Sequence, residues 1–452
     1  MATLSLSDSA YRRDLGGGLV LRWSVAADAE AIGELYGYVF RRNAEEPRNE
    51  SMIAWQRDLM SGRHPLIGPG DFALVEDTDS GAMVAATCLL WEMWEYDGIA
   101  FPAGRPEVVA SMPDYRNRGL VRAVFELIHA RSAERGHLAQ GITGIPYYYR
   151  QFGYEYALDL GGSRSVYFAA IPKLKDGEQE PYALRDAHVE DLPQLMALYD
   201  RERARGPVST RVGEDYWRWV LGGQNPAAGE GWHTQLIVNG QGRLIGYVLT
   251  GRRRWGDALG VLGMALEPGV ALQPLLPSVL RLLHAQALAM PSQRADEPPA
   301  ARIMFALFGS HPIYDALGER MLAAHEPPYA WYVRVPDLPR FIRHIAPALE
   351  RRLAASMMSG YTGELKINFY RGGLRLVFEQ GRLATAEDYR AAGWRPVAQA
   401  GFPPLVFLQL LFGRRSLAEL RYAFPDAWAD DEARPLLEVL FPAKASWVLA
   451  LD

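Results

Sequence analysis

Residues 107–121 combine a strand-like run with groups that could hold a phosphate: they read Glu-Val-Val-Ala-Ser-Met-Pro-Asp-Tyr-Arg-Asn-Arg-Gly-Leu-Val. This pattern predicts an apolar strand, a turn with two arginines and a glycine, and then the start of a helix. Main-chain N–H groups at a helix N-terminus attract anions. Gly119 lets a ligand approach closely, and Arg116 and Arg118 can add charge-assisted hydrogen bonds. The segment therefore predicts a pyrophosphate-binding turn, called the phosphate turn below (residues 116–121). An ordinary turn with solvated arginines is the alternative.

A second segment follows the predicted helix and a short strand, and it reads Ile145-Pro-Tyr-Tyr-Tyr-Arg-Gln-Phe-Gly-Tyr154. With it the sequence resembles the GNAT superfamily of N-acetyltransferases. Members carry Arg/Gln-x-x-Gly-x-Gly/Ala at a helix start and, later, Tyr-x-x-Phe-Gly-Phe/Tyr. Here the motifs read Arg116-Asn-Arg-Gly119-Leu-Val121 and Tyr149-Arg-Gln-Phe152-Gly153-Tyr154. Val121 departs from the pattern, which has Gly or Ala at this position. Because the main-chain amide can bind the ligand whatever the side chain, we expect cofactor binding to be retained.

The resemblance implies acetyl-coenzyme A as the acetyl donor and a primary amine, attacking directly, as the acceptor. The amides of the splayed strand would bond the pantetheine arm, and the phosphate turn would hold the pyrophosphate. The cofactor-binding residues so implied are Val108, Val109, Ala110, Met112, Arg116, Asn117, Arg118, Gly119, Leu120 and Val121.

The segment before that strand, Trp91-Glu-Met-Trp-Glu-Tyr-Asp97, mixes aromatic and acidic side chains. Aromatic faces and carboxylates both attract an ammonium group. Trp91, Trp94 and Tyr96 are therefore the predicted contacts of a cationic acceptor. Alternation along a strand sends Glu92, Trp94 and Tyr96 to one face, so a half-buried strand with a charged outer face is the alternative.

The elements that must position these residues occur twice. Leu21-Arg22, Asp28, Ile32, Leu35 and Tyr36 match Leu184-Arg185, Asp191, Leu195, Leu198 and Tyr199, each pair at an offset of 163 residues. Tyr149-x-x-Phe152-Gly153 has an echo in Tyr314-x-x-Leu317-Gly318, at an offset of 165. Two matches in one order predict tandem domains. Where the phosphate turn should recur, residues 266–275 carry two prolines and no arginine. We expect no coenzyme A in the second copy and a structural Tyr314.

A third region follows an arginine-rich helix at residues 339–355. Its apolar segments, residues 402–413 and 437–442, are similar to those of sterol carrier protein domains. Together with the phosphate turn and the degenerate second copy, they resemble the Eis-type (enhanced intracellular survival) branch of the superfamily. We expect an α+β fold of three domains: a catalytic GNAT domain at 1–172, a degenerate GNAT-like domain at 182–338, both with mixed sheets flanked by helices, and a sterol carrier-like α+β domain at 339–452.

Three residues are candidates for the proton transfers of the reaction. By motif match, Tyr149 would protonate the leaving thiolate; packing alone is the alternative. In Eis-type relatives the carboxylate at the end of the chain reaches the active site, and the matching residue is Asp452. It offers a terminal and a side-chain carboxylate as the base. Glu107, on the cofactor strand, is the alternative base, and Asp452 would then lie in solvent.

Composition limits the classes of function. The chain has 452 residues, a formal net charge of −5 and one cysteine. This net charge does not indicate binding to nucleic acid or to an anionic membrane. A single thiol excludes a framework of disulfide bonds within the chain. The histidines form no pair at metal-ligand spacing, and no apolar run reaches the roughly 20 residues that span a bilayer. We expect a cytoplasmic enzyme without a metal; the resemblance implies a homo-oligomer, a hexamer in Eis-type relatives.

The expected function is acetyl-coenzyme A-dependent N-acetylation of an aminoglycoside-like or polyamine-like molecule. The alternative is a non-catalytic protein that binds a lipid or another small ligand in its sterol carrier-like region. The degenerate second copy favours this alternative, but the intact phosphate turn argues against it, because a pure binder would not need one.

Overall fold

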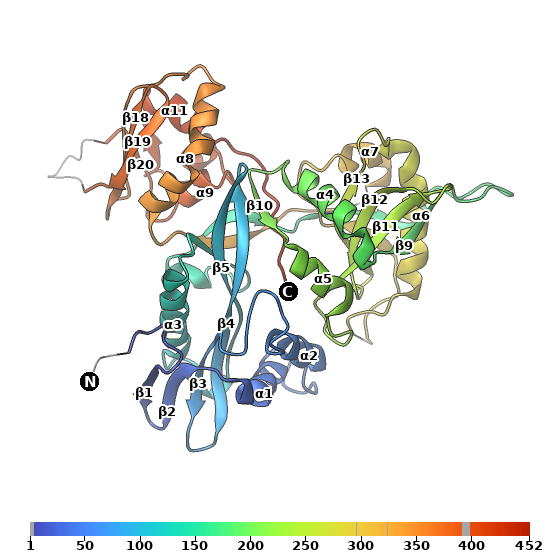
Figure 1. The fold of residues 1–452 in the computed structure, drawn as a ribbon, viewed down its shortest axis with the longest axis horizontal. Helices are drawn as coiled ribbons and strands as arrows, with labels where there is room; N and C mark the ends of the chain where they lie inside the picture. Colours follow the sequence, from blue (N-terminus) through green and yellow to red (C-terminus); the bar gives the residue numbers. More distant parts are fainter. Residues whose placement is uncertain (1–3, 295, 323, 391–397) are drawn as a thin grey trace.

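The chain folds around three sheets flanked by helices (Figure 1). The computed structural model describes residues 4–294, 296–322, 324–390 and 398–452. Both larger sheets mix parallel and antiparallel neighbours. The α+β fold class expected from the sequence is therefore confirmed.

The first sheet is built mainly from the N-terminal part of the chain. Its strands, in spatial order, are β1 (Arg12–Gly16), β2 (Leu19–Trp23), β3 (Phe72–Asp77), β4 (Ala82–Tyr96), β5 (Ile99–Ser111), β6 (Ala139–Ile142), β16 (Tyr329–Arg334) and β7 (Glu155–Leu160), with β10 (Val208–Arg211) beside β4. Helices α1 (Ala29–Val39) and α2 (Glu50–Leu59) belong to one hydrophobic core of this region, and α3 (Leu120–Glu134) belongs to another. Cores on both faces explain why residues 83–90 of β4 form a continuous buried run.

The second sheet repeats this arrangement. Its strands are β15 (Ala324–Glu326), β8 (Ser163–Tyr167), β14 (Arg302–Phe305), β13 (Ala258–Leu266), β12 (Leu244–Gly251), β11 (Trp232–Asn239) and β9 (Tyr182–Asp186). Its helices are α4 (Leu192–Arg203), α5 (Glu214–Gly222), α6 (Leu272–Ala289) and α7 (Ile313–Met321).

The repeat is visible at the level of single ion pairs. The guanidinium of Arg22 donates to both carboxylate oxygens of Asp28, at 2.7 and 2.8 Å. Arg185 and Asp191, the matching residues of the second copy, form the same two bonds at 2.7 Å each. Each bidentate pair fixes the entry of a helix relative to the strand before it.

The two copies exchange one strand each. In the first sheet β16 lies between β6 and β7, and it is antiparallel to both. In the second sheet β8 lies between β14 and β15, again antiparallel to both. The segment 329–334, expected in the second domain, thus completes the first sheet, and 163–167 completes the second. The two copies are interlocked.

The third sheet belongs to the C-terminal region, with strands β19 (Arg382–Asp388), β18 (Gly373–Glu379), β17 (Gly363–Asn368), β20 (Ala400–Gly401) and β21 (Trp428–Ala429). Its helices are α8 (Leu338–Ala354), α9 (Phe407–Leu411), α10 (Leu417–Ala423) and α11 (Ala433–Leu440). Helix α9, from the first of the two apolar segments noted in the sequence, lies in one core with Trp94 and Tyr96 of β4. The likeness of this region to sterol carrier proteins stays a prediction.

The last residues return to the first two sheets. The amide of Trp447 donates to the carbonyl of Val208 at 2.9 Å, and the amide of Leu449 donates to Oγ1 of Thr210 at 3.0 Å. Residues 446–452, the C-terminal segment, therefore run along β10. Figure 1 places the end of the chain between β4 and α5.

Candidate active site

Strands β5 and β6 separate soon after they meet. They pair in parallel only at Ala103–Ala139 and Gly104–Gln140, and β5 then continues to Ser111 beside β4. Opposite β4 the register shifts, so that Val108 and Val109 face a single residue. Val108 has φ = 51°. A branched residue in this region is strained, and such a bulge redirects main-chain groups away from the neighbouring strand.

The phosphate turn follows directly. Asn117 and Gly119 both have positive φ, 63° and 77°, and such a turn aims successive N–H groups into one concavity. Gly119 caps helix α3 without a side chain, and a Cβ at Gly119 would meet no atom within 4 Å. Arg116, Asn117 and Arg118 are exposed. The first amides of α3 and two guanidinium groups are therefore available to an anion.

The strand residues differ in what they offer a cofactor. The amide of Met112 donates to the carbonyl of Val84 at 2.9 Å, and the amide of Val108 donates to the carboxylate of Glu107 at 3.1 Å. Met112 can therefore contribute only its carbonyl oxygen or its side chain. Any amide bonds from this strand to a pantetheine arm would come from its other residues.

Tyr149 is buried at the start of the short helix Tyr148–Phe152, with its ring 5.8 Å from Phe125 and 5.3 Å from Tyr332. Among the residues that the structure describes, no group forms a hydrogen bond with its hydroxyl. Burial, and then the nearby charge of Glu107, raise the pKa of Tyr149. The phenol therefore keeps its proton at neutral pH, and no protein group competes for it.

The guanidinium group of Arg105 lies close to three carboxylates. Arg105, on β5, lies 3.3 Å from Glu92, 2.7 Å from Glu107 and 2.5 Å from Asp452. Arg105 is 3% exposed and Glu92 is fully buried. Burial alone would lower the pKa of Arg105, but Asp452, Glu107 and Glu92 together raise it well above its usual value. We call these four residues the carboxylate cluster; both candidate bases, Glu107 and Asp452, belong to it.

The C-terminal segment holds Asp452 in place through its main chain as well. The hydroxyl of Tyr216, on α5, donates to the main-chain oxygen of Asp452 at 2.8 Å. Arg105 also donates to the carbonyl of Leu451 at 2.9 Å. His64 is buried beside this point, and burial lowers its pKa to about 4, so its ring is neutral at physiological pH. Asp452 does not extend into solvent, which was the alternative for this residue.

Glu230 is a residue that the sequence reasoning missed. It precedes β11, and it lines the same cavity as Asp452. Burial, followed by the charges of Asp452 and Glu107, raises the pKa of Glu230 to about 7. A carboxylate with this pKa can take up and release a proton near neutrality. It meets Asp452 where the C-terminal segment packs against the second copy, a contact between distant parts of the chain, so no local motif could have indicated it.

None of the expected acceptor residues lines the cavity that Asp452 and Glu230 share. Trp94 is fully buried, and its ring nitrogen donates to Glu92 at 2.6 Å. The hydroxyl of Tyr96 donates to the carbonyl of Leu411 at 2.7 Å, and the ring is 1% exposed. Both side chains are covered by the C-terminal region, so they have no surface for an acceptor. Trp91 is 39% exposed and lies near His64 at a shallow surface depression.

The second copy is built differently where the first has its site. The hydroxyl of Tyr314 shares its proton between the carbonyls of Phe305 and Leu307, at 3.0 and 3.2 Å, and accepts from the amide of Leu307 at 3.2 Å. In place of the phosphate turn, Glu267 forms an ion pair with Arg201 at 3.5 Å. Tyr314 is thus held by the main chain of its own copy, as a structural tyrosine would be.

Two further searches concern the described part of the chain only. Its His, Cys, Asp and Glu side chains form no group of three or more that could hold a metal ion. No helix within it is both long enough and apolar enough to cross a membrane.

Comparison with known proteins agrees with this geometry. Residues 22–157 match the family model described as an acetyltransferase (GNAT) domain. This part of the chain is therefore similar to GNAT acetyltransferase domains. Among curated proteins, none matches the sequence significantly.

Solved structures share the fold over nearly the whole chain. A conserved protein of unknown function from Enterococcus faecalis, described as a probable N-acyltransferase, has a TM-score of 0.68 at 14% identity, covering 96% of this chain and 99% of its own. A GCN5-related N-acetyltransferase from Kribbella flavida has a TM-score of 0.60 at 18% identity, covering 99% and 100%. Eis1 from Mycobacterium abscessus has a TM-score of 0.56 at 14% identity, covering 96% and 99%. At these identities the likeness concerns the fold.

Proposed function

We propose that the protein transfers the acetyl group of acetyl-coenzyme A to the primary amine of a small cationic acceptor, the class to which polyamines and aminoglycosides belong. The observation that carries this proposal is the bulged strand β5, which leads into the exposed turn at the open N-terminus of α3. Acetyl-coenzyme A would supply a thioester whose carbonyl carbon accepts the amine. The residues of the phosphate turn fit its pyrophosphate, because they combine exposed arginines with uncapped amides.

The remaining chemistry falls to residues near β5. Glu107 or Asp452 would take the proton that the amine loses as its new C–N bond forms. Tyr149 would give its own proton to the sulfur as the C–S bond breaks, because its hydroxyl has no other partner. Arg105 would act as a positioning residue, since it holds both candidate bases in one place.

The test is a pair of measurements on the purified protein. Acetyl-coenzyme A should raise the melting temperature, because it binds only the folded protein. Addition of a panel of primary amines should then release free thiol and yield acetylated products. If acetyl-coenzyme A gives no thermal shift and no amine is acetylated, the proposal is wrong.

A further inference from the structure

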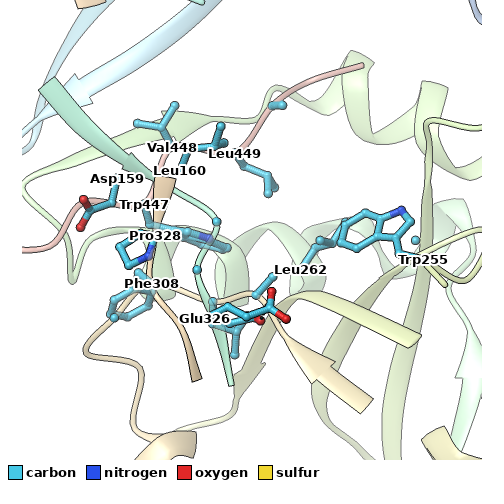
Figure 2. A pocket seen from close by; sticks show the side chains of 18 of the residues that line it. Asp159, Leu160, Trp255, Leu262, Phe308, Glu326, Pro328, Trp447, Val448 and Leu449 are labelled. Atoms are coloured by element: carbon cyan, nitrogen blue, oxygen red, sulfur yellow. Dashed lines mark hydrogen bonds between the residues drawn. The ribbon is translucent and has the colours of Figure 1, made fainter. Parts of the chain in front are cut away.

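A cavity of about 310 Å³ lies between the second sheet, the connection of β7 to β8, and the C-terminal segment (Figure 2). Most of the side chains that surround it are apolar, and they include Leu160, Trp255, Leu262, Phe308, Pro328 and Trp447. Cavities of this size with apolar walls are typical of small-molecule sites. The walls come mainly from the second copy and the C-terminal segment, not from the catalytic copy.

The acidic residues of the cavity fall into two groups. Asp159 lies 3.3 Å from Arg414, and Glu326 lies 3.4 Å from Arg302, so their charges are compensated. Glu230 forms no ion pair with any described residue. Asp452 shares the single guanidinium of Arg105 with two glutamates. The carboxylates without a counter-charge of their own are therefore those near Asp452, whereas Arg164, another lining residue, stacks over the ring of Tyr314 at 4.6 Å.

The excess of carboxylates at the Asp452 end of the cavity favours the binding of a cation. Three carboxylates share the guanidinium of Arg105, Glu230 lies near enough to feel the charges of Asp452 and Glu107, and the buried ring of His64 is neutral. A bound ammonium would lower the electrostatic cost of ionising Glu230, which lies near the carboxylate of Asp452. The same two carboxylates could then accept its proton.

We propose that this cavity holds the acceptor, and that the acceptor is a primary amine on an aromatic, apolar body, an arylalkylamine. The proposal rests on the proposed function and specifies its substrate. The ammonium lies between Glu230 and Asp452, and the ring lies among Leu262, Phe308 and Trp447. A polyamine or an aminoglycoside would place further ammonium or hydroxyl groups against these apolar walls without partners, at a cost in free energy.

The first experiment compares phenethylamine with spermidine and kanamycin as acceptors for the full chain with acetyl-coenzyme A. Burial of an aromatic ring predicts that kcat/KM for phenethylamine exceeds the other two by about tenfold or more. Leu262→Trp, which fills the cavity, should raise the KM for phenethylamine by about tenfold and leave the affinity for acetyl-coenzyme A unchanged. Leu288→Trp is the matched control, since Leu288 is 65% exposed on α6; it should change neither value.

Two further measurements distinguish failure of the cavity proposal from failure of the proposed function. Calorimetry of phenethylamine binding, without acetyl-coenzyme A, tests the cavity alone: binding should be lost in Leu262→Trp and weakened in Glu230→Gln, which keeps the shape of the side chain. Phenethylamine that does not bind the wild type, or turnover of spermidine that Leu262→Trp leaves unchanged, would overturn the cavity proposal while acetylation stands. Binding of phenethylamine without any acetylation would instead overturn the proposed function.

Discussion

Arg105 and Asp452 are 347 residues apart in the chain, yet Nη2 of the first lies 2.5 Å from Oδ1 of the second. This contact joins the C-terminal segment to the bulged strand β5. It also brings the two candidate bases, Glu107 and Asp452, to one guanidinium. Asp452 is thereby part of the wall of the site.

Arg105→Met should destabilise the fold strongly. It would leave Glu92 fully buried without its counter-charge, and breaking a buried pair in this way costs about 3–5 kcal/mol. Urea unfolding measures the loss. Arg375→Met is the matched control, because Arg375 pairs with Glu364 and Glu387 at a more exposed position, where about 1 kcal/mol or less is expected. Equal losses in the two variants would contradict this view of the carboxylate cluster.

Removal of Leu451 and Asp452 should abolish turnover and leave the affinity for acetyl-coenzyme A unchanged. The deletion takes away one candidate base, whereas the phosphate turn lies after β5, at the start of α3. Asp452→Asn separates the side-chain carboxylate from the main-chain one, and calorimetry with coenzyme A checks the cofactor site. Full turnover after the deletion would assign the base to Glu107 or Glu230.

Tyr149→Phe should lower kcat by about 100-fold or more, since general acid catalysis contributes this much. Its hydroxyl has no partner within the described protein, so the melting temperature should change little. Tyr314→Phe is the opposite case: it removes a hydroxyl that donates to main-chain carbonyls and accepts from the amide of Leu307, and it should cost about 1–2 kcal/mol without affecting kcat. A loss of stability in Tyr149→Phe at full activity would show that Tyr149 only packs.

Arg118→Ala should weaken acetyl-coenzyme A binding by about tenfold, the value of one charge-assisted hydrogen bond to phosphate. The effect should fall as salt is added, because exposed charges are screened. Arg421→Ala, at an exposed position of α10, is the control and should bind normally. Normal binding by Arg118→Ala would mean that the turn does not hold the pyrophosphate through this side chain.

Glu230→Gln should change how stability depends on pH. Folded Glu230 keeps its proton up to about pH 7, whereas the ordinary value is 4.5. Between these values the folded state binds more protons than the unfolded state, so the wild type loses stability as pH rises. Glutamine does not titrate, and the advantage of the variant should therefore grow from pH 5 to pH 8 in urea unfolding. A constant difference would show that Glu230 ionises at its ordinary pH.

The sequence predicted those features of the fold that depend on residues close together in the chain. The strand ending at Ser111, the turn with Gly119 and the helix that follows depend on residues close in the chain, and all three elements are present. The duplication was visible for the same reason, since Arg22 and Asp28 form a local pair that Arg185 and Asp191 repeat.

What the sequence could not indicate depends on distant packing. Alternation correctly put Trp94 and Tyr96 on one face of β4, but which face is covered depends on α8 and α9, far along the chain. Glu230 lies in a segment without a motif, and it meets Asp452 only because the C-terminal segment packs against the second copy. The strand exchange has no local signal either, because β8 and β16 read as ordinary strands wherever they pair.

Because β8 and β16 are exchanged between the copies, the first sheet cannot be completed as soon as the first copy has been synthesised. The first sheet lacks the strand between β6 and β7 until residue 334 has been made. At translation rates of about 5–20 residues per second, the interval after β7 lasts roughly ten to thirty seconds. The nascent chain must keep these strand edges from pairing with other chains throughout that time. The first copy, which carries the phosphate turn, can therefore complete its sheet only after most of the second copy has been synthesised.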